Sequence, residues 1–215
     1  MKMKKGFFMI MMFGIWTILL QIVDVQKAGE SMTKIGFATF NGWFHKVTGV
    51  HMWIYTVTDW LGLVAVFICM IFGVIGSVQL LKRKSLLKVD KDILILGVYY
   101  LLVISGYLLF EMIPINYRPI LIEGRMEASY PSSTTLLVLS VMPTLIFQCK
   151  RRIQNIKLRK ICCRIAMLFT VFMVVGRLIS GVHWFTDIVG SVLLCVGLFE
   201  LYKGHVMLYC KENRN

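Results

Sequence analysis

Long uncharged apolar runs are the feature that most limits what this chain can fold into. The clearest runs cover residues 7–22, 60–81 and 93–110, and each crosses most of the roughly 30 Å hydrocarbon core of a bilayer. Weaker runs cover residues 134–148, 161–176 and 188–202, and the last two contain Arg164 and Glu200. Flanking residues or local thinning of the bilayer would let these shorter runs span. We therefore predict an all-α, polytopic membrane protein whose six transmembrane helices form one domain over residues 1–215.

The composition excludes two other classes of protein. Hydrophobic residues make up 58% of the 215 and charged residues 16%, whereas soluble domains average about half and about a quarter. The 14 Phe, 8 Tyr and 5 Trp are far more than a disordered chain carries. Neither a water-soluble monomer nor an intrinsically disordered chain fits these values.

The placement of the basic residues predicts an orientation. Most of the 24 Lys and Arg precede the first run, follow the sixth, or lie between runs two and three and between runs four and five. The exceptions are Lys27, Lys34, Lys46, Arg118, Arg125 and Arg177. Under the positive-inside rule this bias places both termini in the cytoplasm, as an even number of spans requires. Topology and contact with anionic lipids account for the net charge of +13, so we expect no nucleic-acid partner.

The six cysteines give no sign of a covalent or metal framework. They all fall within predicted spans or on the predicted cytoplasmic side, where thiols stay reduced. No two pairs of cysteines stand at the spacing of a metal site with four ligands. We expect neither a disulfide framework nor a zinc site.

The outer segment of residues 26–52 mixes apolar and polar residues. Phe37, Phe40, Phe44 and Val47 recur at helical spacing, with Trp43 beside them. This pattern predicts an interfacial helix between the first two spans. Its role is either anchoring in the interface by aromatic side chains or guiding a lipid toward a site.

Several polar segments gather on the predicted outer side. They are residues 116–119, residues 129–135, Arg177 and residues 183–187. Arg177 follows three apolar or small residues, and an ionisable residue at such depth is a functional candidate unless its side chain snorkels to water. The polar set therefore predicts a site at the outer face.

His183 and Asp187 have the spacing of a nucleophile and its partner. If span six begins near His183, the i,i+4 spacing places both side chains on one helical face. The carboxylate could then hold one ring nitrogen and leave the other free to attack. Arg118 and Arg177 could grip a phosphate through paired hydrogen bonds. The residues expected at the N-terminus of span four, where remaining phosphate oxygens would bind, are Ser132, Ser133 and Thr134.

These residues resemble the type 2 phosphatidic acid phosphatase superfamily, whose motifs can be written K-x6-RP, PSGH and SR-x5-H-x3-D. The corresponding segments here are Glu111-x6-Arg118-Pro119, Pro131-Ser132-Ser133-Thr134 and Gly176-Arg177-x5-His183-x3-Asp187. The third pattern alone would occur by chance in roughly one chain in a hundred of this length. All three, in order and on one predicted side of the membrane, are specific.

The resemblance implies a membrane-embedded lipid phosphatase. His183 would be the nucleophile that forms a phosphohistidine, Asp187 its orienting carboxylate, and Arg118 and Arg177 the phosphate clamps. The family pattern implies no metal and no other cofactor. The substrate would be a lipid phosphate or diphosphate, and the sequence does not reveal an oligomeric state.

The chain departs from the family motifs at Glu111, Thr134 and Gly176, where the family has lysine, histidine and serine. The family's second histidine protonates the leaving oxygen, which threonine cannot do. Losing a general acid costs on the order of 10² to 10⁴ in rate for an alkoxide leaving group. A phosphate leaving group, with a second pKa of about 6, can depart unprotonated. We therefore expect a preference for lipid diphosphates, and undecaprenyl diphosphate fits an outward-facing bacterial site.

The Glu111 change places a carboxylate where the family motif has a cation. A carboxylate facing the phosphate would repel it, so Glu111 is expected to pair with Arg118 or Arg125, and Arg125 would partly supply the missing cation. Glu123 and Glu127 are read as solvated loop charges.

Two alternatives to the diphosphatase remain: a broad phosphatase for phosphatidic acid or phosphatidylglycerol phosphate, and a catalytically silent relative that only binds lipid phosphate.

Overall fold

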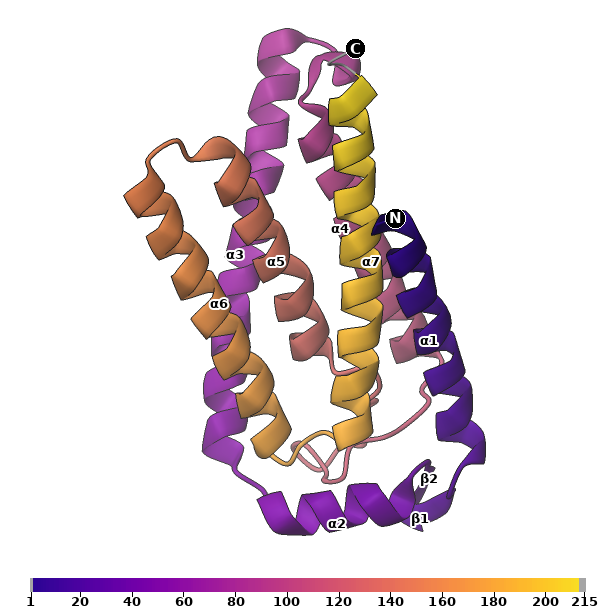
Figure 1. The fold of residues 1–215 in the computed structure, drawn as a ribbon. Helices are drawn as coiled ribbons and strands as arrows, with labels where there is room; N and C mark the ends of the chain where they lie inside the picture. The colour runs from indigo at the N-terminus through magenta and orange to yellow at the C-terminus, as the bar shows by residue number, and fades with distance from the viewer. Residues whose placement is uncertain (1, 213–215) are drawn as a thin grey trace.

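The fold is a bundle of six long helices, seen in a computed structural model that describes residues 2–212 (Figure 1). Within that part of the chain, six helices are long and apolar enough to cross a membrane. They are α1 (Lys2–Ile22), α3 (Met52–Arg83), α4 (Lys91–Met112), α5 (Ser133–Arg152), α6 (Ile156–Ile179) and α7 (Phe185–Glu212). Each contains one of the predicted runs, so the six predicted spans are confirmed.

The weak hydropathy of the fourth run has a structural cause. Helix α5 lies inside the bundle, and 56% of the residues in its most apolar 18-residue stretch are buried in the protein. Its polar side chains Ser140, Thr144 and Gln148 are almost fully buried against other helices rather than exposed to lipid. Polar residues at such protein-facing positions cost little, because they find hydrogen-bond partners such as Tyr100 and Tyr202.

Small residues let α1 pack closely on α7. A Cβ atom added at Gly197 would lie 2.7 Å from the Ile10 side chain, and one at Gly204 would lie 2.8 Å from the Met3 side chain. Close approach through glycine is the usual way that transmembrane helices gain van der Waals contact. The chain's first and last helices therefore lie side by side, with both termini at the same end of the bundle (Figure 1).

The other end of the bundle is closed by a hairpin and a short helix. Strands β1 (Gln26–Ala28) and β2 (Thr33–Ile35) pair in antiparallel register, and α2 (Ala38–Thr48) lies across the helix ends (Figure 1). The prediction of a helix within residues 26–52 is therefore right only for 38–48, and the hairpin is a correction. Asn41 fixes α2 by donating hydrogen bonds to Gly36 O and Thr186 Oγ1 at 2.9 and 3.0 Å.

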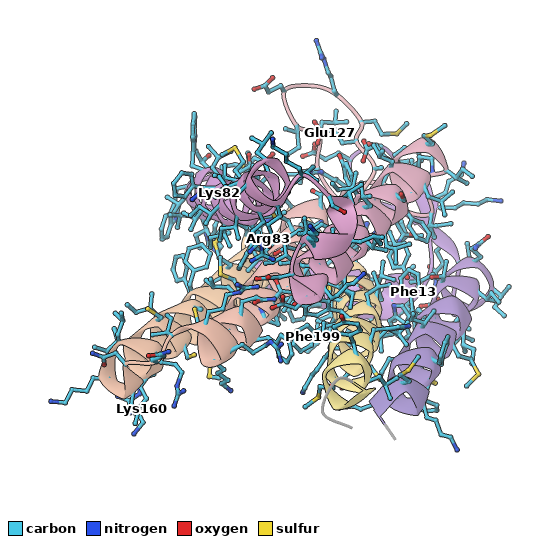
Figure 2. All side chains as sticks on the ribbon, turned by 90° about the horizontal axis from the view of Figure 1, so that it is seen from above. Phe13, Lys82, Arg83, Glu127, Lys160 and Phe199 are labelled. Carbon is cyan, nitrogen blue, oxygen red and sulfur yellow. The ribbon has the colours of Figure 1, made fainter. Side chains whose placement is uncertain are left out.

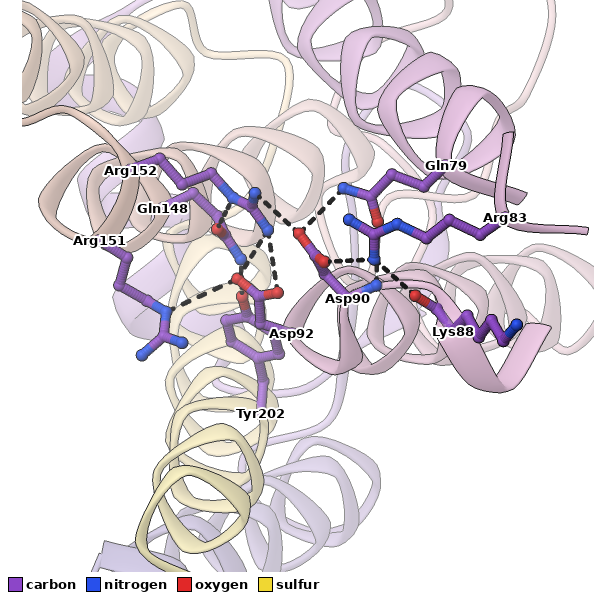
Figure 3. A network of polar contacts seen from close by, with 9 residues as sticks. All are labelled: Gln79, Arg83, Lys88, Asp90, Asp92, Gln148, Arg151, Arg152 and Tyr202. Atoms are coloured by element: carbon purple, nitrogen blue, oxygen red, sulfur yellow. Dashed lines mark hydrogen bonds and ion pairs between the residues drawn. The ribbon is translucent and has the colours of Figure 1, made fainter. Parts of the chain in front are cut away.

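A polar network ties four helices together at the end that carries the termini (Figure 3). Asp90, which precedes α4 just after the 3-10 turn η1 (Leu86–Lys88), accepts hydrogen bonds from Gln79 and Arg83 of α3 at 2.9 and 2.8 Å. Arg152 of α5 contacts both carboxylate oxygens of Asp92 at 2.9 Å. Viewed along the bundle from this end, Arg83 lies toward the middle and Lys160 at the periphery (Figure 2).

Candidate active site

The four residues expected to bind and attack phosphate lie together at the end closed by α2. Arg177 is in the last turn of α6, His183 in the α6–α7 loop, Asp187 in the first turn of α7, and Arg118 in the α4–α5 loop. All four are buried, with relative exposures of 8% for Arg118, 3% for His183 and 0% for the other two. Both guanidinium groups lie over the ring of Tyr55, which shows that they are neighbours.

The imidazole of His183 presents one free nitrogen. Its Nδ1 atom lies 3.1 Å from the carbonyl oxygen of Ser129, which can only accept, so Nδ1 carries the hydrogen and Nε2 carries the lone pair. Nε2 is buried and has no hydrogen-bond partner in the described part of the chain. Burial, and then the charges of Arg118 and Arg177, hold the pKa of His183 well below its ordinary value. The ring is therefore neutral at neutral pH, as a nucleophile must be.

Asp187 reaches the site differently from the sequence expectation. Helix α7 begins at Phe185, so His183 precedes the helix and the shared-face argument is wrong. The carboxylate caps α7 instead: Oδ2 accepts from the Trp184 backbone N–H at 2.9 Å, and Oδ1 accepts from Asn116 Nδ2 at 3.1 Å. Oδ2 is still 3.9 Å from His183 Nδ1, close enough for an electrostatic contribution but too far for a hydrogen bond.

The loop that carries His183 is fixed on both sides. Gly181 has a φ of +72°, and a Cβ atom there would overlap the carbonyl oxygen of Gly49 in the α2–α3 link. The backbone N–H of His51 donates to Ser180 O at 2.9 Å, and Trp184 Nε1 donates to Tyr117 O at 2.8 Å. His183 is therefore positioned by the segments before α3 and after α4.

Arg177 is held by the N-terminal end of α3. Its Nη1 atom lies 3.4 Å from both Tyr55 O and Thr58 Oγ1 and 3.6 Å from Asp59 Oδ1. Its Nε and Nη2 atoms have no partner among the described residues. A Cβ atom at Gly176 would lie 2.8 Å from the Thr58 methyl group, which explains why glycine stands where the family motif has serine.

Arg118 is placed by two antiparallel segments of the α4–α5 loop. Tyr117 and Ala128 form a bridge, and the Arg118 backbone N–H donates to Glu127 O. Arg118 Nη2 forms an ion pair with Glu127 Oε2 at 3.1 Å, so Glu127 takes the role expected of Glu111. Its Nε and Nη1 atoms are buried without a partner in the described chain.

Glu111 and Arg125, the two supporting residues predicted from the Glu111 change, do not take part in the contacts that hold Arg118 and Arg177. Glu111, exposed at the end of α4, lines a cavity of about 260 Å³ together with Tyr107, Arg118 and Glu127. Arg125 is exposed in a turn, where its backbone bonds to that of Ile122.

The N-terminus of α5 lies beside a second, largely apolar cavity. Ser132 is the N-cap of α5, and its Oγ donates to Thr135 Oγ1 at 3.0 Å. Ser133 and Thr134 line a cavity of about 280 Å³ between α3, α4 and α5. Ser133 and Tyr107 line both cavities, so the polar and apolar spaces meet at these two side chains.

Sequence reasoning missed three contributors to this arrangement. The carbonyl group of Ser129 left no trace, because a backbone acceptor does not depend on residue type. Tyr55 and Thr58 lie just outside the predicted second span, and their i,i+3 spacing on one face of α3 is the only available sign.

The fold and the buried, unpaired nitrogens define a six-span membrane protein with a candidate anion site at one end. Residues 94–207, more than half of the chain, match the family model of the PAP2 superfamily. The chain therefore belongs to the PAP2 superfamily, and the resemblance read from its motifs is confirmed.

A solved structure supports the same fold. The chain is similar to the crystal structure of a transmembrane PAP2-type phosphatidylglycerolphosphate phosphatase from Bacillus subtilis, with a TM-score of 0.64 and 20% sequence identity. The similarity covers 94% of this chain and 96% of that one. A comparison with curated proteins finds no match.

Proposed function

We propose that this protein is a membrane lipid phosphatase that works through a phosphohistidine on His183. One observation carries the proposal: unpaired nitrogens of three buried side chains lie in one site. Two nitrogens of Arg118, two of Arg177 and Nε2 of His183 are buried without partners among the described residues. Leaving so many polar atoms unpaired is costly unless a ligand rich in acceptor oxygens completes them. A phosphate group held between two guanidiniums meets that need.

The chemistry is a double displacement. The lone pair of His183 Nε2 attacks phosphorus, the bond from phosphorus to the leaving oxygen breaks, and the lipid departs with the bonding electrons. Nδ1 keeps its proton, which it donates to Ser129 O, so the phosphorylated ring carries a positive charge. The nearby carboxylate of Asp187 stabilises this charge. A water molecule then attacks phosphorus, and the P–Nε2 bond breaks with its electrons returning to the ring. The water protons leave with inorganic phosphate, and the neutral imidazole is restored.

The preferred substrate is a lipid diphosphate, with undecaprenyl diphosphate as the representative. Thr134, in the first turn of α5, cannot protonate a leaving alkoxide. A diphosphate avoids this demand because its leaving group is a phosphate. The apolar cavity that Thr134 lines would take the first part of the lipid chain.

We further propose that the site faces outward and both termini face the cytoplasm. The site lies at the end of the bundle opposite the termini (Figure 1). Most basic residues of the chain lie on the terminal side, where the positive-inside rule expects the cytoplasm. The substrate would therefore be drawn from the outer leaflet.

Trapping of the covalent intermediate tests the proposal. Purified full-length protein is mixed with prenyl diphosphate labelled in its terminal phosphate, quenched in alkali and analysed for protein-bound label. Label is expected in the parent and in His205→Ala, whose histidine bonds Leu201 O far along α7, and not in His183→Ala. Hydrolysis without histidine-bound label would refute the covalent route, and binding without hydrolysis would identify a silent relative. Phosphatidic acid and phosphatidylglycerol phosphate serve as comparison substrates.

A further inference from the structure

One face of α3 contacts the phosphate clamp but belongs to none of the three motifs. Tyr55, Thr58 and Asp59 follow the i,i+3,i+4 spacing of a helix face, at the outer end of α3. Thr58 Oγ1 and Asp59 Oδ1 lie 3.4 and 3.6 Å from Arg177 Nη1. Tyr55 differs from these two residues because it contacts both arginines.

The ring of Tyr55 lies under two cations. The guanidinium carbon of Arg177 is 4.7 Å from the ring centroid, and that of Arg118 is 5.6 Å away. Both distances fall within the roughly 6 Å at which an aromatic face attracts a cation. The carbonyl oxygen of Tyr55 also lies 3.4 Å from Arg177 Nη1.

Two buried guanidiniums without an anion between them repel each other. Arg177 forms an ion pair with Asp59, and Arg118 forms one with Glu127. The side chains of Asp59 and Glu127 are 56% and 40% exposed, so water weakens their attraction. An aromatic ring in contact with both cations offsets the repulsion from inside the protein.

An aromatic face has a second advantage over a carboxylate. A carboxylate binds a guanidinium through its N–H groups and so competes with phosphate for the same donors. A ring attracts the flat face of the guanidinium and leaves those N–H groups free. This matches the unpaired Nε and Nη atoms of Arg118 and Arg177.

We infer that Tyr55 is a positioning residue that holds Arg118 and Arg177 as a preformed clamp for a tetrahedral oxyanion. This inference rests on the proposed function, because the oxyanion is the phosphate end of the substrate. The ring provides the effect, and the hydroxyl group does not. Tyr55 acts through the two arginines and does not itself touch the reacting atoms.

The test compares variants that keep or remove the aromatic face. Tyr55→Phe keeps the ring, whereas Tyr55→Leu and Tyr55→Met replace it with apolar groups without a π face. Trp53→Leu is the matched control, because Trp53 is an exposed aromatic two residues earlier on the same helix. Each full-length variant is purified, and the inhibition constant of orthovanadate, kcat and KM are measured. Calorimetry with inorganic phosphate gives a binding constant that does not require activity.

The expected result is a split between the variants. Loss of both cation–π contacts in Tyr55→Leu and Tyr55→Met should raise the vanadate inhibition constant and the phosphate Kd about tenfold. Tyr55→Phe and Trp53→Leu should stay within about twofold of the parent, which corresponds to less than about 0.5 kcal/mol. A purely structural role would lower the folded fraction and leave the inhibition constant of that fraction unchanged.

Other outcomes overturn the inference, the proposed function or both. Unchanged vanadate and phosphate affinities in both Leu and Met variants would show that the ring does not support the clamp. A Tyr55→Phe variant as impaired as Tyr55→Leu would assign the role to the hydroxyl group. If the parent binds phosphate but hydrolyses no lipid, the proposed function fails while the phosphate titrations still decide the role of Tyr55. A parent that binds no phosphate removes both.

Discussion

The Nδ1 atom of His183 lies 3.1 Å from the carbonyl oxygen of Ser129 and 3.9 Å from Asp187 Oδ2. The tautomer of His183, the proposed nucleophile, is therefore set by a backbone acceptor, and the carboxylate adds charge rather than a hydrogen bond. Asp187 has a separate task at the start of α7, where it accepts from the Trp184 backbone N–H at 2.9 Å. These two tasks can be separated by mutation.

Asp187→Asn should keep the stability of the protein and lose turnover. An amide oxygen can still accept from the Trp184 N–H, so the cap survives. The Asn116 amide can turn its unpaired oxygen toward the new NH2 group, but the negative charge beside the phosphorylated ring is gone. Turnover is expected to fall about 10²- to 10³-fold, the range that follows removal of one preorganised electrostatic stabiliser of a transition state. Asp187→Ala should also lower the unfolding free energy by about 1 kcal/mol, the typical value of a lost cap.

Thermal unfolding in detergent and steady-state turnover measure the two effects. Asn116→Ala removes the hydrogen bond to Asp187 Oδ1 and leaves the charge in place, so it is the matched comparison. Equal losses of turnover in Asp187→Asn and Asn116→Ala would contradict the electrostatic role.

The depressed pKa of His183 predicts an acid limit of activity below pH 6.5. Burial and the two arginines disfavour the protonated ring, so the nucleophile stays available through the ordinary titration range of histidine. The same shift removes stability as the pH falls below 6.5, because the unfolded chain then gains a proton that the folded site resists. Quenched-flow measurement of phosphohistidine formation from pH 5 to 8, corrected for substrate ionisation by ³¹P NMR, checks the limit. A midpoint at or above 6.5 that persists in Asp187→Asn, which removes titration of the neighbouring carboxyl group, would count against it.

The sequence was informative where one physical constraint dominates. Apolar runs predict spans because the bilayer penalises unpaired backbone and charge, and the confirmed helices contain all six runs. The order of Arg118, Arg177, His183 and Asp187 predicted a shared site, which the fold brings together. The second predicted run begins at residue 60 rather than at Met52 because residues 55–59 include Tyr55, Thr56, Thr58 and Asp59, which lower the hydropathy without breaking the helix.

Other features depend on tertiary contacts that leave little trace in a sequence. The start of α7 at Phe185 follows from capping by Asp187, which a spacing rule alone does not locate. The strands of residues 26–28 and 33–35 are too short to show alternation. In the sequence, Tyr55 looks like an ordinary interfacial aromatic residue. Only its contacts with the two arginines distinguish it from the other aromatic residues of that segment.

Gly176→Ser should impair the protein unless Thr58 is made smaller. The new Cβ atom would lie 2.8 Å from the Thr58 methyl group, so α3 and α6 would have to separate and Arg177 would shift with them. We expect a destabilisation of about 1–3 kcal/mol, the usual range for overpacking, and weaker phosphate binding. Thr58→Ser removes the methyl and keeps the hydroxyl that contacts Arg177, so the double variant should recover. The absence of coupling in this double-mutant cycle would refute the steric explanation.

Asp90→Asn should lower stability at neutral pH but not in acid. Partial burial opposes ionisation of Asp90, yet hydrogen bonds from Arg83, Gln79 and Arg152 outweigh it and hold its pKa below the ordinary value of 3.8. The folded protein therefore binds this proton less tightly than the unfolded chain. The resulting stabilisation is present above pH 3.8 and is lost as the pH falls through the folded-state pKa. The difference at pH 7 should be at most about 1 kcal/mol, because the group is partly exposed.

Thermal unfolding of the parent and Asp90→Asn between pH 3 and 8 checks this dependence. Glu123→Gln, which changes an exposed loop carboxylate, controls for the loss of one negative charge. A difference that does not shrink as the pH falls from 5 to 3 would mean that the network is held by contacts other than the ionised carboxylate.

Thr134→His should restore hydrolysis of phosphomonoesters. The Thr134 methyl group lies 3.5 Å from where a Cβ of Gly62 would stand, and the side chain borders a cavity of about 280 Å³ that can receive an imidazole. A general acid there would protonate a leaving alkoxide and raise monoester turnover by roughly 10² to 10⁴. Diphosphate turnover should change little, because its phosphate leaving group departs without a proton.

A substrate panel in detergent measures both rates for the parent, Thr134→His and Thr134→Gln. Glutamine is similar in size and polar but cannot donate an acidic proton, so it isolates the acid function from the change in shape. Equal gains for phosphatidic acid and prenyl diphosphate would remove the leaving-group explanation. A gain shared by Thr134→Gln would assign the effect to pocket shape. A monoester gain confined to Thr134→His would link the threonine directly to the diphosphate preference.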